Sequence, residues 1–266
     1  MKISRIRIGE NEVHYATPVD PQGTSMEILS GDPFQGVHLT GERVTQFTLL
    51  APMVPAAILC IGLNYRKHAE EMNAKAPKFP VLFFKNPGAL LDPGASIQTP
   101  RKLPSTQVDY EGELAVIIGK TCRNVTRENA LSHVLAYTVA NDVSARDWQK
   151  DWGGSQWCRG KSFDTFAPMG PWMVTPDEIP NPNALRITTK VNGEILQDSN
   201  TGDMIFDVPA LIEFLSADTT LSVGTIILTG TPSGVGVGRT PQRWLHPGDS
   251  VEVEIEGIGR LENLVV

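Results

Sequence analysis

The chain has 266 residues, of which 41% are hydrophobic and 20% charged, and its formal net charge is −7. This length and composition are typical of a globular protein with one large domain, or with a large and a small one. No basic run offsets the acidic balance, so nucleic acid is not expected as a partner. An anionic substrate would need a bound cation or a few well-placed Arg and Lys residues.

The first 55 residues are expected to form a small N-terminal domain of short strands, because Gly and Pro punctuate its apolar segments. The apolar stretch of residues 49–63 contains two prolines and is too short to span a bilayer. The first ten residues lack the apolar region of a signal peptide, and the three widely spaced cysteines form no CxxC pair. We therefore expect a cytoplasmic protein in a reduced compartment, without membrane contact.

Residues 56–266 are expected to form the main domain. Strands are predicted at residues 57–61, 81–84, 114–118, 136–140, 185–191, 225–228 and 250–255. Two short helices are predicted: Thr126 would cap the first, whose apolar residues between 130 and 135 share one face, and Asp207 would cap the second. Strands with so few helices do not make a doubly wound sheet, so the predicted fold class is mainly β (α+β).

A histidine and a glutamate lie three residues apart in the segment of residues 64–71. If this segment is helical, His68 and Glu71 are neighbours on its surface. A carboxylate beside an imidazole fixes its tautomer and raises its basicity, which produces a general base. The alternative is a solvated helix face, which the flanking Arg66, Lys67 and Glu70 favour.

Two glutamates precede the apolar strand at residues 114–118. Glu111 and Glu113 are alternate residues, so in a strand both carboxylates point the same way, about 7 Å apart. Burying unpaired carboxylates is costly, and a cation that prefers oxygen ligands, such as Mg²⁺, Mn²⁺ or Ca²⁺, removes that cost. An exposed strand edge with two solvated charges is the alternative.

The strand at residues 136–140 runs into a second polar segment. Asp142 at its end could supply a third carboxylate to the glutamate pair, or could cap a turn. Arg146 and Gln149 lie three residues apart and could face one ligand, with Arg146 binding a carboxylate. A surface ion pair of Arg146 with Asp147 or Asp151 is the alternative.

Two further segments carry polar groups, and each segment has two possible interpretations. Lys161 could steady a developing enolate oxygen or could pair with Asp164. The glycine-rich segment of residues 228–238 is not a phosphate loop, because no Gly-Lys-Ser/Thr sequence follows it. Its backbone N–H groups and the hydroxyls of Thr229 and Thr231 could cradle a small carboxylate, and a structural turn is the competing interpretation.

From about residue 58 to the end, the chain resembles the fumarylacetoacetate hydrolase superfamily. Six segments carry the resemblance in the same order: GLNYRKHAEE at residues 62–71, DYEGELAV at 109–116, NDVSARD at 141–147, GKSFD at 160–164, VNGE at 191–194 and TGTPSGVG at 229–236. The resemblance implies a β-roll or mixed β-sandwich catalytic domain behind a small N-terminal β domain, in a homodimer. In the enzymes that name the family, a fourth acidic ligand lies seven residues before the histidine, where this chain has Ile61.

The resemblance also implies roles for individual residues. Glu111, Glu113 and Asp142 match the ligands of Mg²⁺ or Mn²⁺, and His68 and Glu71 match the catalytic dyad, which lies on a lid over the substrate. Lys161 matches the active-site lysine, Thr231 the carboxylate-binding threonine, and Arg146 and Gln149 polar residues that line the pocket. With Ile61 in place of the fourth ligand, the site is similar to the acylpyruvase and decarboxylase branch.

We therefore expect an enzyme that acts on a small 2-oxo acid with a divalent metal. Hydrolytic C–C cleavage of an acylpyruvate through a metal-bound enolate is the first expectation. Oxaloacetate tautomerisation, isomerisation of a 2-hydroxymuconate-type diacid and oxaloacetate decarboxylation are alternatives, because all pass through the same enolate. Residues 147–157 resemble the branch that contains oxaloacetate tautomerases. A non-catalytic keto-acid binding protein is a further alternative, and specificity is expected in residues 72–78 and 147–157.

Overall fold

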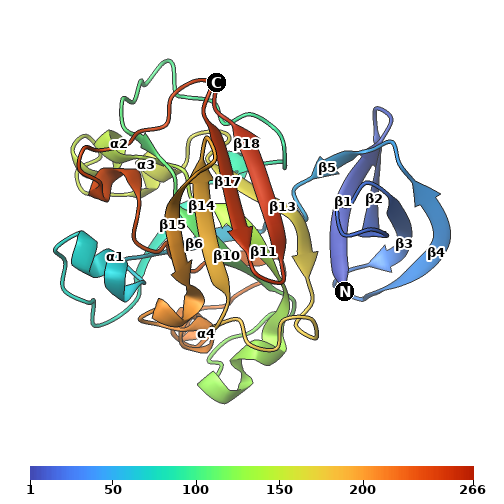
Figure 1. Cartoon of the computed structure of the whole chain (residues 1–266). Helices are drawn as coiled ribbons and strands as arrows, with labels where there is room; N and C mark the ends of the chain where they lie inside the picture. The colour runs from blue at the N-terminus through green and yellow to red at the C-terminus, as the bar shows by residue number, and fades with distance from the viewer.

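The computed structural model describes all 266 residues, Met1–Val266, and strands dominate it (Figure 1). The strands are β1 Lys2–Ile8, β2 Glu12–Pro18, β3 Met26–Asp32, β4 Gly36–Val44, β5 Thr48–Leu50, β6 Ala57–Gly62, β7 Val81–Lys85, β8 Leu90–Leu91, β9 Val108–Asp109, β10 Gly112–Ile118, β11 Val134–Asn141, β12 Ser144–Ala145, β13 Ala167–Val174, β14 Arg186–Val191, β15 Glu194–Asn200, β16 Thr225–Leu228, β17 Ser250–Ile255 and β18 Gly259–Leu264. The α-helices are α1 Arg66–Glu71, α2 Arg146–Lys150, α3 Cys158–Lys161 and α4 Val208–Ser216, and the 3-10 helices are η1 Pro87–Ala89, η2 Arg127–His133, η3 Thr201–Asp203 and η4 Gly236–Gly238.

Strand β10 lies at the centre of the fold, and both of its faces are buried. It pairs antiparallel with β11 on one side and with β16 on the other, in a sheet of order β4-β3-β2-β1-β13-β11-β10-β16-β6-β7. Leu114, Val116 and Ile118 belong to one hydrophobic core, and Ala115 and Ile117 to another. A strand buried on both faces has a continuous apolar sequence rather than an alternating one, which explains this run.

A second, four-stranded sheet of order β15-β14-β17-β18 packs on one face of β10. Ile187 of β14 and Val253 of β17 share a core with Leu114, so this sheet covers the face that carries Leu114. The opposite face carries Glu113 together with Ala115, because alternate residues of a strand point the same way. Helices α1, α2 and α3 lie together on the side of the molecule away from the N-terminal strands (Figure 1).

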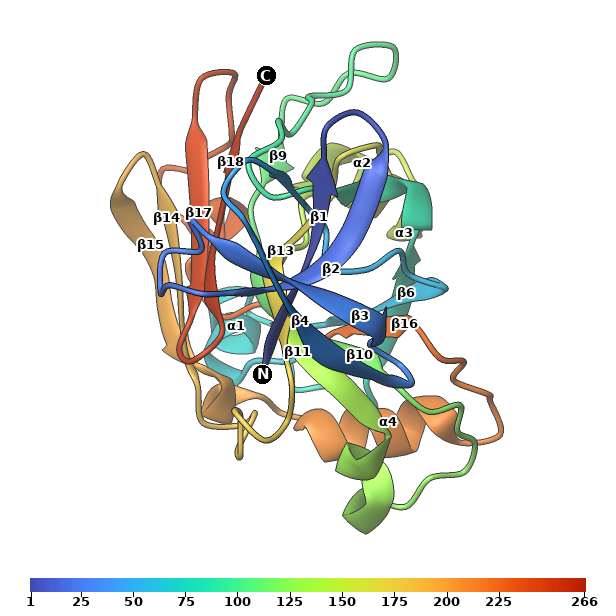
Figure 2. The ribbon, with the colours of Figure 1, turned by 90° about the vertical axis from the view of Figure 1, so that its right-hand side faces the viewer.

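Strands β1 to β5 form a small unit with a core of its own. That core contains four buried side chains, Ile6, Ala16, Met26 and Ile28. Figure 2 shows these strands in front of the remainder of the chain, with α4 at the bottom of the view. The first residues of β1 also pair with β13, Lys2 opposite Val174, so hydrogen bonds join the unit to the main sheet. A domain boundary at residue 55 remains a proposal.

The predicted strands are all present, with ends that differ by at most two residues, and the mainly β fold class is confirmed. Asp207 caps α4 as predicted, because its Oδ1 accepts the Ala210 N–H at 3.0 Å. No helix has both the length and the apolar character that a membrane span requires.

The predicted helix after Thr126 is wrong in part. Residues 127–133 form the 3-10 helix η2, and the Thr126 side chain makes no capping hydrogen bond. Val134 and Leu135, assigned to the same helix face, already belong to β11, where Val134 pairs with Ile118. A short apolar run fits a helix face or a strand equally well, and here the ladder with β10 decides for the strand.

Candidate active site

Three buried carboxylates meet where β10 begins and β11 ends. Glu113 lies in β10, Glu111 directly precedes this strand, and Asp142 directly follows β11. Each residue is at most 5% exposed, and one oxygen from each lies within 4.8 Å of the others. Two oxygens bound to one ion at about 2.0–2.6 Å are at most about 4–5 Å apart, so the three carboxylates fit one divalent cation.

Backbone hydrogen bonds fix the three carboxylates. The Asp142 N–H donates to the Glu111 carbonyl at 2.8 Å, and the Glu111 N–H donates to Oδ1 of Asn141 at 3.0 Å. The Gly230 N–H donates to Oε2 of Glu113 at 2.7 Å. The turn after β11 and the loop after β16 therefore hold the cluster in place through the protein's own contacts.

Two of the predicted cations lie against these carboxylates. Lys161 Nζ is 2.6 Å from Glu111 and 2.7 Å from Asp142, and Arg146 is 2.6 Å from Glu111 and 2.8 Å from Asp109. Both cations are less than 5% exposed. The alternatives that paired them with surface carboxylates are wrong, because the buried acids are their partners.

Glu113 lacks a positive neighbour, since no Lys or Arg nitrogen lies within 4.0 Å of its carboxylate. Burial, together with the negative charges of Asp142 and Glu111, raises the pKa of Glu113 well above its usual range. Burial acts on Glu111 in the same direction, but Arg146 and Lys161 outweigh it and lower the pKa of Glu111. The cluster is therefore short of positive charge at Glu113, which a divalent ion would supply.

His68 and Glu71 form the predicted pair on α1. Nδ1 of His68 lies 3.0 Å from Oε2 of Glu71, and Oε1 of Glu71 accepts the Gly234 N–H at 2.8 Å. A carboxylate at Nδ1 favours the tautomer with the proton on that nitrogen, which leaves Nε2 as the basic atom. His68 is 6% exposed and lines the cavity, so the solvated helix face is wrong for this residue.

The glycine-rich loop after β16 binds carboxylates, but they are the protein's own. Four of its N–H groups donate to side chains: Gly230 to Glu113, Gly234 to Glu71, and Gly236 and Val237 to Asp109. The expected cradle for a substrate carboxylate is therefore wrong for these four donors. A glycine run predicts accessible N–H groups, but it does not identify the carboxylate that takes them.

Short helices place the other polar residues, and their close packing depends on a glycine. Arg146 and Gln149 lie on α2, where the Arg146 guanidinium donates to Oε1 of Gln149 at 3.0 Å. Lys161 ends α3, directly after Gly160. A Cβ at Gly160 would lie 2.6 Å from the Gln149 backbone nitrogen and 2.7 Å from the Ala145 carbonyl oxygen. Only a glycine lets α3 approach α2 this closely.

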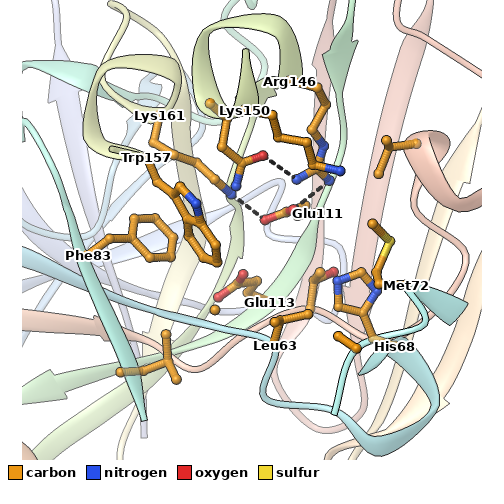
Figure 3. Close-up of a pocket in the computed structure, with 16 residues that line it drawn as sticks. Leu63, His68, Met72, Phe83, Glu111, Glu113, Arg146, Lys150, Trp157 and Lys161 are labelled. Carbon is orange, nitrogen blue, oxygen red and sulfur yellow. Dashed lines mark hydrogen bonds and ion pairs between the residues drawn. The ribbon is translucent and has the colours of Figure 1, made fainter. Parts of the chain in front are cut away.

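Glu111 and Glu113 open onto a cavity of about 220 Å³, whereas Asp142 is fully buried and does not line it (Figure 3). Phe83 and Trp157 form one side, with ring centroids 5.4 Å apart, and His68 and Met72 lie on the opposite side. Gly62 leaves room for the indole, because a Cβ there would lie 2.2 Å from the Trp157 ring. Pockets for drug-sized ligands measure about 300–1,000 Å³, so this cavity suits a molecule of a few carbons.

Of the two threonines predicted to bind substrate, Thr231 lines the cavity and Thr229 does not. The Thr229 hydroxyl donates to the Leu114 carbonyl at 2.9 Å and is turned into the sheet. The Thr231 hydroxyl donates to the Gly112 carbonyl at 3.1 Å and accepts the Gln197 amide at 2.8 Å. Substrate contact remains a proposal for both residues, and only Thr231 is placed for it.

Three charged residues of the site are not predicted from the sequence. Lys85 ends β7 with its Nζ 2.5 Å from Asp142, Asp109 is fully buried against Arg146, and Lys150 lines the cavity from α2. A lysine that closes an apolar strand needs a buried partner, so Lys85 carried a usable signal. Asp109 and Lys150 carried none, because their places follow from the loop after β16 and from the orientation of α2.

Residues 57–266 match the protein family described as fumarylacetoacetate (FAA) hydrolase C-terminal. The mitochondrial oxaloacetate tautomerase fahd2 of Xenopus laevis is 47% identical over 223 residues, which are 84% of this chain and 69% of that protein. The crystal structure of 5-carboxymethyl-2-hydroxymuconate delta-isomerase from Mycobacterium smegmatis is 37% identical, with a TM-score of 0.86 over 100% of this chain and 99% of its own. Fumarylacetoacetate hydrolase from Exiguobacterium antarcticum is 38% identical, with a TM-score of 0.88 and the same coverage.

Proposed function

The chain belongs to the fumarylacetoacetate hydrolase family and is an enzyme of that family, and on this premise we propose that it interconverts the keto and enol forms of a small 2-oxo carboxylic acid. One observation carries the proposal: His68 lines the same small cavity as Glu111 and Glu113. A base and a site for a divalent ion on one cavity are what proton abstraction beside a carbonyl group requires.

The first expectation, hydrolytic C–C cleavage, is not confirmed. The alternative of a tautomerase or isomerase is better supported, because a relative at 47% identity is named an oxaloacetate tautomerase and a structural neighbour at 37% an isomerase. Chemistry favours it too, since tautomerisation needs only a base and stabilisation of the enolate oxygen. Hydrolysis needs, in addition, a positioned water and room for a leaving group.

Glu111, Glu113 and Asp142 are the proposed ligands of Mg²⁺, Mn²⁺ or Ca²⁺. Their fit rests on the 4.8 Å spacing of the oxygens and on the lack of a cation at Glu113. When bound, such an ion supplies a Lewis acid for the carbonyl oxygen at C2 of the substrate. A site with only oxygen ligands discriminates poorly among these three ions, so the proposal covers all three.

His68 is the proposed base. Glu71 holds the proton of the imidazole at Nδ1, so Nε2 is free to take a proton from C3 of the keto form. Gly234 fixes Glu71 in turn through its N–H. The enolate oxygen at C2 then takes a proton from solvent to give the enol, and Nε2 releases its own proton to solvent. In the reverse direction, the enol loses its hydroxyl proton to solvent and the protonated Nε2 returns a proton to C3. A single atom, Nε2 of His68, thus removes the proton from C3 in one direction and returns it in the other.

Lys161 is the proposed stabiliser of the oxygen at C2. Burial alone would lower the pKa of Lys161, but the carboxylates of Asp142 and Glu111 outweigh it, so the pKa is raised. The ammonium has three donors, of which Glu111 and Asp142 take two. The third donor can be offered to the oxygen that becomes negative when the proton leaves C3.

The test is an assay of the purified chain with Mg²⁺ and the enol form of oxaloacetate. Decay of the enol absorbance, and exchange of the C3 protons with deuterium followed by NMR, should both be accelerated over the reaction without enzyme. Pyruvate release is measured in the same samples, so that decarboxylation is counted separately. Cleavage of acetylpyruvate without acceleration of either tautomerisation signal would reject the proposal in favour of hydrolysis.

Hydrolysis stays the second candidate, because the Exiguobacterium antarcticum neighbour at 38% identity is named a hydrolase. In that reaction His68 would deprotonate a water instead of a substrate carbon. The homodimer also remains a proposal. The cytoplasmic location is not confirmed, since the Xenopus laevis relative is named mitochondrial.

A further inference from the structure

One cation at the cavity has no partner. Arg146 and Lys161 lie against Glu111 at 2.6 Å, and Lys161 also contacts Asp142. Lys150 lines the same cavity, yet no carboxylate oxygen lies within 4.0 Å of its Nζ. Its side chain is exposed, so it lies at the solvent side of the cavity. An ammonium with free donors at the entrance of a small polar site attracts an anion.

The helix α2 gives Lys150 its place. Arg146, Gln149 and Lys150 occupy positions i, i+3 and i+4 on one side of the helix, and all three line the cavity. Figure 3 shows Arg146 and Lys150 at the cavity. The exposed side chain of Lys150 loses part of its water at the cavity wall, and this loss, together with the positive charge of Arg146, lowers the pKa of Lys150. A negatively charged group beside Lys150 would relieve that repulsion.

The charges in the cavity show which part of a substrate Lys150 can serve. The positive charges of Arg146 and Lys161 are already offset by buried carboxylates of the protein. The proposed ligand cluster accounts for the first carboxylate and the 2-oxo group of a substrate. A second carboxylate on that substrate would find one lining cation without a partner, Lys150. The cavity of about 220 Å³ limits the distance between the two carboxylates to a few bonds.

We propose that Lys150 binds the second carboxylate of a short 2-oxo dicarboxylic acid and makes the enzyme selective for diacids over monoacids. The inference rests on the proposed function, because the cluster of Glu111, Glu113 and Asp142 is taken to hold the other end of the substrate. It assigns the selectivity to one side chain within the segment of residues 147–157.

The experiment compares oxaloacetate with its 4-methyl ester, which keeps the 2-oxo acid and neutralises the second carboxylate. Tautomerisation and equilibrium binding by calorimetry are measured with Mg²⁺ present. Lys150→Met should lower both kcat/KM and affinity for the diacid about 10- to 100-fold, which corresponds to the loss of one charge-assisted hydrogen bond. For the ester, the same variant should change kcat/KM and affinity less than about twofold. Lys150→Arg should keep the preference, and Lys120→Met, an exposed lysine outside the cavity, should match the wild type.

The outcomes separate the two proposals. Equal losses for diacid and ester, or no loss for either, overturn the role of Lys150 and leave the tautomerase proposal standing. Tight binding of the diacid without turnover, with the affinity lost only for the diacid in Lys150→Met, overturns the tautomerase proposal and supports Lys150. If wild-type protein neither binds nor converts the diacid, both proposals are wrong.

Discussion

His68 reaches the cavity because α1 presents it beside Glu71, which the loop after β16 holds through Gly234. His68→Ala is expected to lower the rate of C3 deuterium exchange in oxaloacetate about 10²- to 10⁴-fold, the usual contribution of a positioned base. Mg²⁺ affinity, measured by calorimetry, should not change, because the imidazole is not among the proposed ligands. His38→Ala removes an exposed histidine and serves as the control. An unchanged exchange rate in His68→Ala would reject the assigned base.

A charged residue of the site can be predicted from the sequence when it interrupts or borders an otherwise apolar strand. Glu111 and Glu113 stand out because they precede an apolar run, and the structure brings both to the cluster with Asp142. Thr229 and Thr231 lie two residues apart in the same glycine-rich segment, so the sequence does not distinguish them, yet only Thr231 lines the cavity. Two residues of a turn differ in direction through backbone angles that side-chain periodicity does not encode.

At the scale of elements, the contact between α2 and α3 sets the position of Lys161. Gly160→Ala would place a methyl group 2.6 Å from the Gln149 nitrogen and 2.7 Å from the Ala145 oxygen, so α3 must shift. We expect a loss of about 1–3 kcal/mol in the free energy of unfolding, as for other overpacked sites, measured by urea denaturation. We also expect a lower kcat, because Lys161 moves with the helix.

Gly88→Ala is the matched control, since a Cβ there meets its nearest side-chain atoms at an ordinary 3.5 Å. Its stability and kcat should stay close to those of the wild type. If Gly160→Ala behaved like Gly88→Ala, the close approach of the two helices would not matter for the site.

The sequence predicts long buried strands better than short helices and loops. The apolar run of β10 is too short for a buried helix and ends in three β-branched residues, Val116, Ile117 and Ile118, which favours a strand. The apolar run after Thr126 fits either a helix or a strand. Pairing of its last residues with β10 places them in a strand, and the sequence pattern does not encode this pairing. The glycine-rich loop is predicted as a source of N–H donors, but Glu71 and Asp109 reach it from far along the chain.

At the scale of the whole molecule, two packed sheets bury the acidic cluster, and this burial is costly without a cation. Glu113→Gln should therefore raise the melting temperature of the metal-free protein, by about 2–4 °C for each kcal/mol gained in a chain of this size. Added Mg²⁺ should stabilise the wild type, by about 2.7 kcal/mol at 100 times Kd, and the variant much less. Calorimetric melting curves with and without Mg²⁺ measure both effects.

Glu42→Gln removes an exposed glutamate of the N-terminal unit and should follow the wild type in both conditions. The same Mg²⁺ shift in wild type and Glu113→Gln would mean that the ion binds elsewhere. A lower melting temperature of metal-free Glu113→Gln would mean that its carboxylate is compensated within the protein.

The most direct test is anomalous diffraction from a crystal of the protein soaked in Mn²⁺. We predict one strong peak per chain, at about 2.0–2.6 Å from a carboxylate oxygen of each of Glu111, Glu113 and Asp142, facing the cavity that His68 lines. Ordered carboxylates with no peak between them, or a peak bound at another place on the chain, would contradict the account.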